Sequence, residues 1–258
     1  MSETPVLEVK GLGIDFGGLT AVNRFNITVN KHQIAGLIGP NGAGKTTVFN
    51  MLTKVYQPSR GTIKLNGKEI TNLSTVEVNK MGIARTFQNI RLFDKMSVID
   101  NVLIGMHNSI TYNTFEGIIR NSNYKKQEEE VYKKALDLLK IFNLDEFKDS
   151  LASSLPYGGQ RRLEICRALG TEPSLLLLDE PAAGMNPSET MELMNTIKYI
   201  RDHFDIAILL IEHDMKFVMG ICEKITVLNY GTTLATGTPE EIQNNPDVIK
   251  AYLGGKWC

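Results

Sequence analysis

The feature that most constrains this 258-residue chain is a glycine-rich stretch, Gly39 to Thr46, which reads GPNGAGKT. An apolar run, QIAGLI, precedes the stretch, and a segment with helical character, TVFNMLTKV, follows it. The stretch fits the pattern G-x-x-x-x-G-K-[ST], which binds nucleotide phosphates when it lies between a strand and a helix. Its glycines let backbone N–H groups turn inward around phosphates, and the helix N-terminus attracts negative charge. The sequence therefore predicts a nucleotide site here rather than an unrelated glycine-rich turn.

Two side chains in this loop have predicted roles. Lys45 is expected to reach the β- and γ-phosphates, and the Thr46 hydroxyl is expected to bind Mg²⁺. The other residues expected to contact the nucleotide lie in the same stretch or directly after it: Gly39, Pro40, Asn41, Gly42, Ala43, Gly44 and Thr47. The expected ligand is therefore a nucleotide with its magnesium ion.

Two apolar runs, 175–178 and 207–211, lack the alternation of a half-exposed strand. The first run ends at Asp179 and Glu180, and the second is followed by an acidic residue and His213. Such runs are typical of central strands in a parallel sheet that is covered on both faces. Ligands of these sheets bind at the carboxyl ends of the strands. The three polar residues are therefore expected at the ligand-binding edge.

The two adjacent acids have different predicted roles. Asp179 is expected to hold Mg²⁺ through water, and Glu180 is expected to polarise the attacking water as a general base. Taken alone, acids at the end of a strand are explained equally well by solubility. Their combination with the phosphate loop favours the functional interpretation.

The spacing of apolar residues changes along the chain. Short apolar runs and turns indicate β structure in the N-terminal region, and Asn66-Gly67 predicts an antiparallel hairpin because both turn positions need a positive φ. From about Met96 to Cys166 the spacing becomes helical. One apolar stripe in QEEEVYKKALDLLKIF contains Val131, Ala135, Leu138 and Leu139. The polar stretch 107–126 before it is expected to be a surface excursion.

Composition excludes several classes of protein. Lys and Arg number 28 against 29 acidic residues, and the resulting net charge of −1 gives no reason to expect nucleic acid as a partner. No apolar run approaches the roughly 18 residues that span a bilayer. The first residues, MSETPVLEVK, lack the pattern of a secretory signal. Cys166, Cys222 and Cys258 form no CxxC pair, which indicates free thiols in a reducing cytosol.

Five motifs follow one another along the chain: GPNGAGKT, RTFQNIRLF, LPYGGQRRLEICRAL, LLLLDEPAAGMNP and LLIEHDM. This order resembles the ATPase subunit of ABC transporters over essentially the whole chain. The resemblance implies an α/β fold with a P-loop NTPase (RecA-like) core, an antiparallel β subdomain and an inserted α-helical subdomain. It implies one ABC ATPase domain, 1–258, with about 1–95 and 167–258 as core plus β subdomain and 96–166 as helical subdomain. It also implies ATP and Mg²⁺ as ligands.

The same resemblance assigns three further residues. Gln88, in RTFQNIRLF, matches the glutamine that contacts Mg²⁺ and the attacking water and carries motion to the membrane partner. His213 matches the histidine that contacts the γ-phosphate, and Phe16 matches the aromatic residue that stacks on adenine. By residue type alone, a histidine at the end of a strand is a surface residue about as often as a functional one. A phenylalanine in a β region is a core residue about as often as a binding residue.

The segment LPYGGQRR departs from the family signature L-S-G-G-Q, and two alignments compete. One sets 156–160 against the signature and recovers its glutamine, whereas the other sets 155–159 against it. The following RRLEICRAL matches the family without a gap only in the second register, which we adopt. The predicted signature loop is then Leu155, Pro156, Tyr157, Gly158 and Gly159.

This signature loop lacks one expected donor. Pro156 stands where the family has serine, so it supplies neither a hydroxyl for the γ-phosphate nor an N–H. One missing hydrogen bond to a charged group weakens binding by about 1.5–3 kcal/mol. We therefore expect weaker ATP-driven dimerisation than a serine version would show, with the helix N-terminus still facing a phosphate. Asn186 is a second departure, because it replaces an aspartate and carries no charge.

The resemblance also implies partners. Two ATPase subunits, identical or homologous companions, are expected to pair head to tail, with each nucleotide between the phosphate loop of one and the signature loop of the other. Integral membrane permease subunits and, indirectly, a substrate-binding protein would complete the complex. The expected location is the cytoplasm, peripheral on the inner face of the membrane. Nucleic acid is not an expected partner.

Four segments narrow the expected substrate: RTFQNIRLF, LPYGGQRRLEICRAL, DEPAAGMNP and GTPEEIQNNPDVIKAYLGG. Together they resemble the ATP-binding subunits of branched-chain amino acid importers, so amino acid uptake is the expected function. Related subunits for urea or amides and for lipopolysaccharide share parts of these segments and remain alternatives. Two rival classes are a soluble ABC-type ATPase that acts on nucleic acid or ribosomes and a regulatory module with vestigial ATPase activity.

Overall fold

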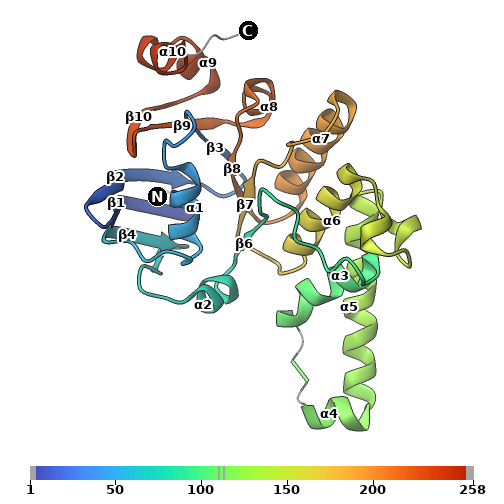
Figure 1. The fold of residues 1–258 in the computed structure, drawn as a ribbon. Helices are drawn as coiled ribbons and strands as arrows, with labels where there is room; N and C mark the ends of the chain where they lie inside the picture. Colours follow the sequence, from blue (N-terminus) through green and yellow to red (C-terminus); the bar gives the residue numbers. More distant parts are fainter. Residues whose placement is uncertain (1–3, 110, 113, 254–258) are drawn as a thin grey trace.

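The computed structural model describes residues 4–109, 111–112 and 114–253, and within them the larger of two β-sheets has six strands (Figure 1). The strand order is β10-β9-β3-β8-β7-β6. Its strands are β3 Ile34–Ile38, β6 Ile83–Arg85, β7 Leu175–Asp179, β8 Ala207–Ile211, β9 Lys224–Asn229 and β10 Thr232–Gly237. All neighbours are parallel except β9 and β10. The prediction of two central parallel strands is confirmed by β7 and β8.

Each face of the larger sheet packs against its own hydrophobic core. Leu176 and Leu178 belong to one core, whereas Leu175 and Leu177 belong to the other. Successive side chains of a strand point to opposite faces, so a strand that is covered on both sides is apolar at every position. This double burial explains why the run 175–178 shows no alternation.

The smaller sheet is antiparallel and has the order β2-β1-β4-β5. Its strands are β1 Leu7–Phe16, β2 Leu19–Val29, β4 Arg60–Leu65 and β5 Lys68–Glu69. Asn66 and Gly67 join β4 to β5 with φ angles of 48° and 76°. The predicted hairpin is therefore confirmed.

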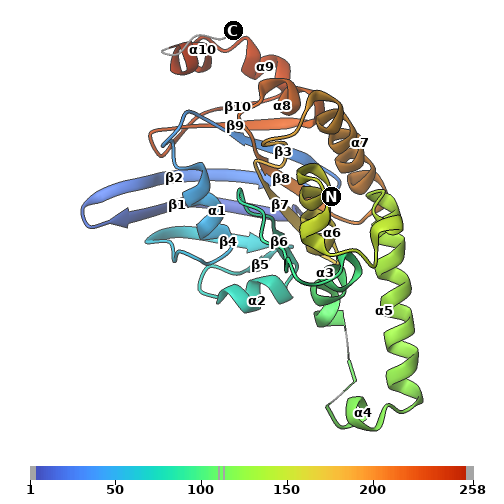
Figure 2. The ribbon, with the colours of Figure 1, turned by 45° about the vertical axis from the view of Figure 1, so that its right-hand side comes forward.

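Helices cover one face of the larger sheet, and the antiparallel sheet with α1 covers the other (Figure 2). Outside the helical insertion the helices are α1 Lys45–Leu52, α2 Thr75–Lys80, α7 Pro187–His203, α8 Met215–Ile221, α9 Pro239–Gln243 and α10 Pro246–Leu253. In Figure 1, α9 and α10 lie at the end of the molecule next to β10. The α/β fold with an antiparallel β subdomain is thus confirmed.

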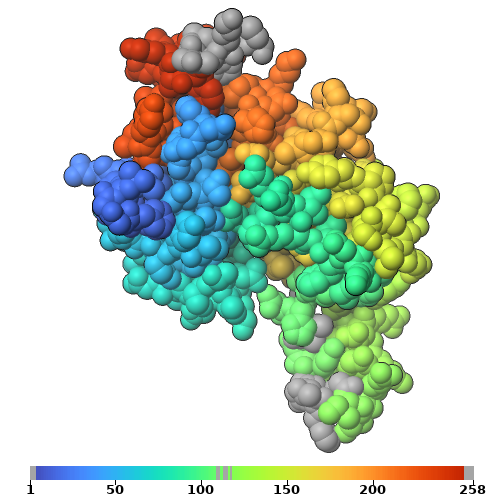
Figure 3. Space-filling view, viewed as in Figure 1, coloured from blue at the N-terminus to red at the C-terminus, as the bar shows by residue number. Residues whose placement is uncertain are grey.

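The helical insertion lies between β6 and β7. It contains α3 Val98–Gly105, η1 Met106–Ser109, α4 Thr114–Ile119, α5 Ser122–Ile141, η2 Asp145–Phe147, η3 Ala152–Ser154 and α6 Tyr157–Leu169. The tip made by α4 and the start of α5 stands clear of the rest of the molecule (Figure 3). The helix α6 passes through 166 without a break, so the expected subdomain boundary falls inside it.

The polar stretch 107–126 is more regular than expected. Apart from residues 110 and 113, which lie outside the described residues, it contains η1, α4 and the first residues of α5. Asn121 precedes α5, and its side chain accepts a hydrogen bond from the Tyr124 N–H at 2.9 Å. Asparagine favours this capping position, which is why an Asn-rich sequence can begin a helix.

No helix among the described residues is both long and apolar enough to cross a membrane. Cys166 and Cys222 are free and buried, as predicted for unpaired thiols. Cys258 lies outside the described residues.

Candidate functional site

The phosphate loop joins β3 to α1, as its motif predicts. Gly39 has a φ of 156°, and a Cβ atom there would lie 2.1 Å from the carbonyl oxygen of Leu228. Gly44 caps α1 with a φ of 103°. A side chain at Gly39 would collide with the backbone of β9, and the φ angles of both positions favour glycine. The glycines therefore shape a close backbone turn at the N-terminus of a helix.

Lys45 lies in this loop with its ammonium group buried. Nζ donates to the carbonyl oxygens of Gly39 at 2.7 Å and Pro40 at 3.1 Å. Burial lowers the pKa of Lys45, and the nearby Glu180 and Asp179 carboxylates oppose that shift. These hydrogen bonds go to neutral carbonyl groups, so an anion in the loop would compensate the buried charge. The loop thus fits a phosphate group.

A cavity of about 740 Å³ opens at this loop. Its lining includes the predicted residues Asn41, Gly42, Ala43, Gly44, Lys45, Thr46, Thr47, Gln88 and Glu180. Leu19, Thr20, Ala21, Tyr230 and Gly231 complete the lining. Gly39 and Pro40 do not line the cavity, but their carbonyl oxygens accept hydrogen bonds from Lys45 Nζ. The structure therefore brings the phosphate loop and two of the predicted catalytic residues to one cavity.

Two predicted catalytic residues, Gln88 and His213, lie next to the carboxylate of the third, Glu180. Gln88 Nε2 donates to Glu180 Oε2 at 2.9 Å, and His213 Nδ1 lies 3.7 Å from the same oxygen. The three residues follow β6, β7 and β8, which are adjacent in the sheet. Because the carboxyl ends of parallel strands share one edge, residues distant in sequence converge there.

The backbone at Glu180 is unusual. Its φ is 49°, in the left-handed region that few residues other than glycine adopt. Left-handed conformations of this kind cluster at functional sites, where the surrounding structure holds them. Here the Glu180 N–H donates to the Ile211 carbonyl at 2.9 Å, which fixes the turn after β7.

Asp179 is buried and forms an ion pair with Arg85, whose Nη2 lies 2.7 Å from Oδ2. The Asp179 N–H also donates to the Thr86 hydroxyl at 3.3 Å. The ion pair with Arg85 orients the carboxylate through Oδ2. Sequence reasoning missed Arg85, although an arginine inside the apolar segment GIART is a usable signal.

A second missed residue is Glu212, which is also buried. Its Oε1 accepts from the Ala182 N–H at 2.9 Å, and its Oε2 accepts from the His213 N–H at 3.1 Å. Burial raises the pKa of Glu212, and these backbone N–H groups oppose the shift. Glu212 therefore ties the segment after Glu180 to the segment that carries His213.

The predicted signature loop lies away from the cavity of its own chain. None of its five residues, 155–159, lines that cavity. Pro156 is the N-cap of α6, so the helix starts at Tyr157 and the two glycines lie in its first turn. The first N–H groups of a helix have no partner within the helix, which leaves them available to an anion.

Two predicted positions have contacts within the chain. Phe16 packs edge-on against Tyr56 with ring centroids 5.3 Å apart, and it does not line the cavity. Tyr230 is the aromatic residue in that lining. Asn186 is the N-cap of α7 and accepts from the Glu189 N–H at 3.0 Å. This capping explains how an uncharged asparagine is accommodated there.

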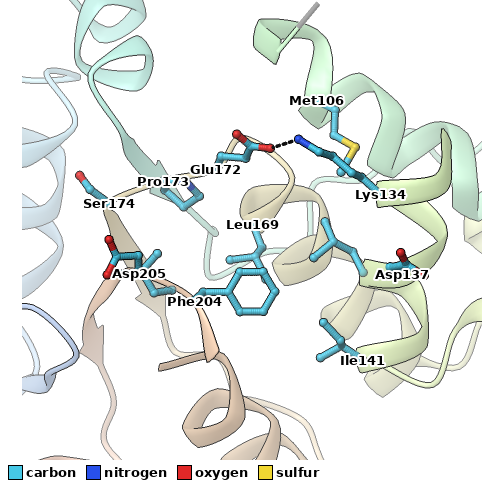
Figure 4. A pocket seen from close by; sticks show the side chains of 12 residues that line it. Met106, Lys134, Asp137, Ile141, Leu169, Glu172, Pro173, Ser174, Phe204 and Asp205 are labelled. Carbon is cyan, nitrogen blue, oxygen red and sulfur yellow. Dashed lines mark hydrogen bonds and ion pairs between the residues drawn. The ribbon is translucent and has the colours of Figure 1, made fainter. Parts of the chain in front are cut away.

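A separate apolar cavity of about 440 Å³ lies between α5, the end of α6 and the start of β8 (Figure 4). Leu138, Leu169 and Phe204 line it, and the Lys134–Glu172 ion pair, at 2.8 Å, lies at its rim. None of the site residues predicted from the sequence lines this second cavity. The nucleotide site is therefore assigned to the cavity at the phosphate loop.

The fold and the site define a P-loop nucleotide-binding protein. Residues 22–183 match the family described as ABC transporter. Residues 232–257 match a second description, branched-chain amino acid ATP-binding cassette transporter. The chain belongs to the ABC transporter family, and it is an ATP-binding cassette ATPase.

Individual relatives support this placement. The chain is 50% identical to the high-affinity branched-chain amino acid transport ATP-binding protein LivG of Escherichia coli, over 97% of this chain and 98% of that protein. It is 31% identical to the lipopolysaccharide export system ATP-binding protein LptB of Haemophilus influenzae, over 96% and 97%. The crystal structure of the ADP conformation of MJ1267, an ATP-binding cassette of an ABC transporter, aligns with a TM-score of 0.84 at 29% identity, covering 97% and 99%.

Proposed function

We propose that this chain hydrolyses MgATP to drive uptake of branched-chain amino acids through a membrane permease. The convergence of Gln88 and His213 on Glu180, beside the phosphate loop, is the observation that carries the hydrolytic part. The 50% identity to LivG over nearly the whole chain supports the substrate.

The proposed roles follow from the contacts. Lys45 and the backbone of the phosphate loop are proposed to bind the phosphates, and Thr46, Asp179 and Gln88 are proposed to hold Mg²⁺. The ion, when bound, neutralises charge on the phosphate oxygens. Among the described residues no cluster of three His, Cys, Asp or Glu could hold a metal. The proposed ion would instead bind the Thr46 hydroxyl, the Gln88 amide oxygen and phosphate oxygens, with Asp179 reaching it through water.

Hydrolysis needs a base close to the water. Glu180 is the proposed base, because its carboxylate lines the cavity and is oriented by the hydrogen bond from Gln88. His213 Nδ1 lies 3.7 Å from the same oxygen, and His213 is proposed to contact the γ-phosphate. The hydrogen bond from Gln88 holds the Glu180 carboxylate in one place for proton transfer.

A head-to-tail dimer would complete the site. The signature loop 155–159 does not line the cavity of its own chain, whereas the first N–H groups of α6 are free to bind an anion. We propose that these groups face the γ-phosphate of a nucleotide held by a second ATPase subunit. Closure of such a dimer supplies donors on the second face of the phosphate and links hydrolysis to movement.

A groove of about 450 Å³ next to Gln88 is the proposed permease contact. It is lined by Phe87, Arg91 and Arg167, and also by Phe93 and Ile104, which expose 47% and 39% of their surface. Exposed apolar side chains beside arginines suit a protein partner. A permease segment seated there would touch the segment that carries Gln88.

The substrate assignment is tested by transport. The chain is combined with its two permease subunits and binding protein in vesicles, and ATP-dependent uptake of labelled leucine, isoleucine and valine is compared with that of urea. We expect saturable uptake of the amino acids, which is lost when Lys45→Ala replaces the native chain. Uptake of urea alone would refute the substrate, and amino acid uptake that persists with Lys45→Ala would refute the role of the phosphate loop.

A further inference from the structure

The segment that carries Gln88 is held by a buried arginine of α6. The Arg161 side chain is fully buried. Its guanidinium donates to the carbonyl oxygens of Phe87 and Gln88, each at 2.6 Å, and to Glu164 Oε2 at 2.9 Å. Residues 87–91 belong to no helix or strand. The hydrogen bonds from Arg161 therefore take the place of a regular backbone partner.

Glu164, one turn along α6, holds the same segment through its N–H groups. Its Oε1 accepts from the Arg91 N–H at 3.1 Å and from the Phe87 N–H at 3.4 Å. Burial raises the pKa of this carboxyl group, and Arg161 opposes the shift. The pair thus binds carbonyl and N–H groups on both sides of Gln88. A buried ion pair contributes little net stability by itself, so its value here lies in the position it imposes.

The start of α6 also touches the segment after Glu180. A Cβ atom at Gly184 would lie 2.9 Å from Cε1 of Tyr157, which shows that the ring lies directly against that glycine. The Tyr157 hydroxyl lies 3.5 Å from Arg161 Nη2. The first two turns of α6 therefore contact both segments that bring catalytic residues to the cavity.

We propose that Arg161 and Glu164 are positioning residues that fix Gln88 to the first turns of α6, so that the signature loop and Gln88 of one subunit move together. This inference rests on the proposed function, in which the start of α6 faces a second subunit's nucleotide. A shift of the signature loop on binding there would be transmitted to Gln88 in the subunit's own site. The two nucleotide sites would then be linked through the ion pair.

The test compares two neighbouring arginines of α6. Arg161→Gln removes the charge that holds the Gln88 segment. Arg162→Gln is the matched control, because Arg162 pairs with Glu192 of α7 at 2.6 Å and, among the described residues, forms no hydrogen bond with either segment. With the full-length chain, we expect Arg161→Gln to lower kcat about tenfold or more, with the calorimetric Kd for ATP within about twofold of the native value. Arg162→Gln should change neither quantity.

A charge swap separates positioning from simple ion pairing. Arg161→Glu combined with Glu164→Arg restores opposite charges, but it presents a carboxylate to carbonyl groups and a guanidinium to N–H groups. We expect kcat to stay low. Recovery of kcat in the swap, or loss of ATP binding in step with kcat in Arg161→Gln, would overturn the proposal in favour of a purely structural pair.

Hydrogen exchange of the native chain tests the contacts even if the variants fail to fold. The amides of Phe87 and Arg91 should exchange slowly although they belong to no helix or strand, because Glu164 accepts from both. Exchange at the rate of an exposed loop would overturn the proposal. A native chain without ATPase activity but with slow exchange at these amides would refute the proposed function and leave the ion-pair contacts in place.

Discussion

Gln88 donates a hydrogen bond to Glu180 across 2.9 Å, although 92 positions separate the two residues in the sequence. The bond joins the segment after β6 to the residue that follows β7. Since Arg161 holds the backbone of Gln88 and Glu212 holds the segment after Glu180, each end of this bond has its own buried support. The pair is therefore prepared for a ligand before one binds, which reduces the reorganisation that catalysis requires.

Removing the carboxylate charge at Glu180 should separate binding from turnover. Glu180→Gln keeps the length of the side chain and removes the proposed base. We expect kcat to fall by about 10²–10⁴-fold, with ATP binding retained and a nucleotide-bound dimer accumulating. Phosphate release, calorimetry and size-exclusion chromatography measure the three outcomes. Unchanged hydrolysis would remove Glu180 from this role.

Breaking the buried pair at Asp179 should be costly for stability. Arg85→Ala leaves a buried carboxylate without its partner, which lowers the free energy of unfolding by about 3–5 kcal/mol. Lys134→Ala is the control, since its pair with Glu172 is about 60% exposed on both sides and contributes at most about 1 kcal/mol. Urea denaturation compares the two variants. Equal losses would contradict the buried geometry of Arg85.

Two glycines with the same backbone angle should respond differently to alanine. Gly184 and Gly42 each have a φ of 77°, but only at Gly184 would a Cβ atom meet a neighbour, Tyr157. The left-handed conformation costs about 1–2 kcal/mol in both variants. Thermal unfolding of the nucleotide-free chain should therefore show a larger loss for Gly184→Ala. Adding Tyr157→Ala should remove the excess, and no difference between the two glycines would contradict the ring contact.

Lys54 gives the chain a predictable dependence on alkaline pH. Burial lowers its pKa from 10.5 to about 8, and its Nζ donates to the Thr71 carbonyl at 2.8 Å. Between these two pKa values the unfolded chain binds more protons than the folded chain, so the free energy of unfolding rises with pH. The penalty for the buried ammonium is present in full below about pH 8.

The comparison with Lys54→Met isolates this effect. The free energy of unfolding of the native chain, relative to the variant, should rise between about pH 8 and pH 10. Urea titrations across that range measure the difference, and other titrating groups cancel in it. A difference that stays flat or falls would show that Lys54 is not desolvated in the folded chain.

The aromatic contact to the adenine base can be assigned by two substitutions. Phe16, matched to the stacking position by its motif, lies outside the cavity lining, whereas Tyr230 lines it. Loss of base stacking weakens binding by about 1–3 kcal/mol. The family resemblance predicts that Phe16→Ala raises the Kd for ATP about tenfold, and we expect Tyr230→Ala to leave it nearly unchanged because Tyr230 is 89% exposed. The reverse pattern, measured by calorimetry, would transfer the role to Tyr230.

Features that depend on neighbouring residues could be read from the sequence. The phosphate loop, the Asn66-Gly67 hairpin and the two central strands each rest on a local pattern with a direct physical cause. The convergence of Glu180 and His213 followed from one further rule, that parallel strands end at a common edge, whereas the position of Gln88 was implied by the family resemblance. These parts of the fold and site were accessible without coordinates.

Features that depend on partners distant in the sequence could not be predicted from it. Arg161 and Glu164 read as ordinary polar positions of a helix, because their backbone partners lie more than 70 positions away. Arg85 and Glu212 are buried charges whose partners the sequence does not name. A buried charge becomes visible only when its partner is known, since the partner is what permits the burial.

The helix α5 has 20 residues, which makes it about 30 Å long. The residues it buries, Ala135, Leu138 and Leu139, all lie in its second half, so the first half extends outward to α4 (Figure 2). A rod held at one end magnifies rotation at the other, and a tilt of about 10° displaces the free end by about 5 Å. A probe attached near α4 would therefore record small rearrangements around the nucleotide as large displacements, far from the groups that perform the chemistry.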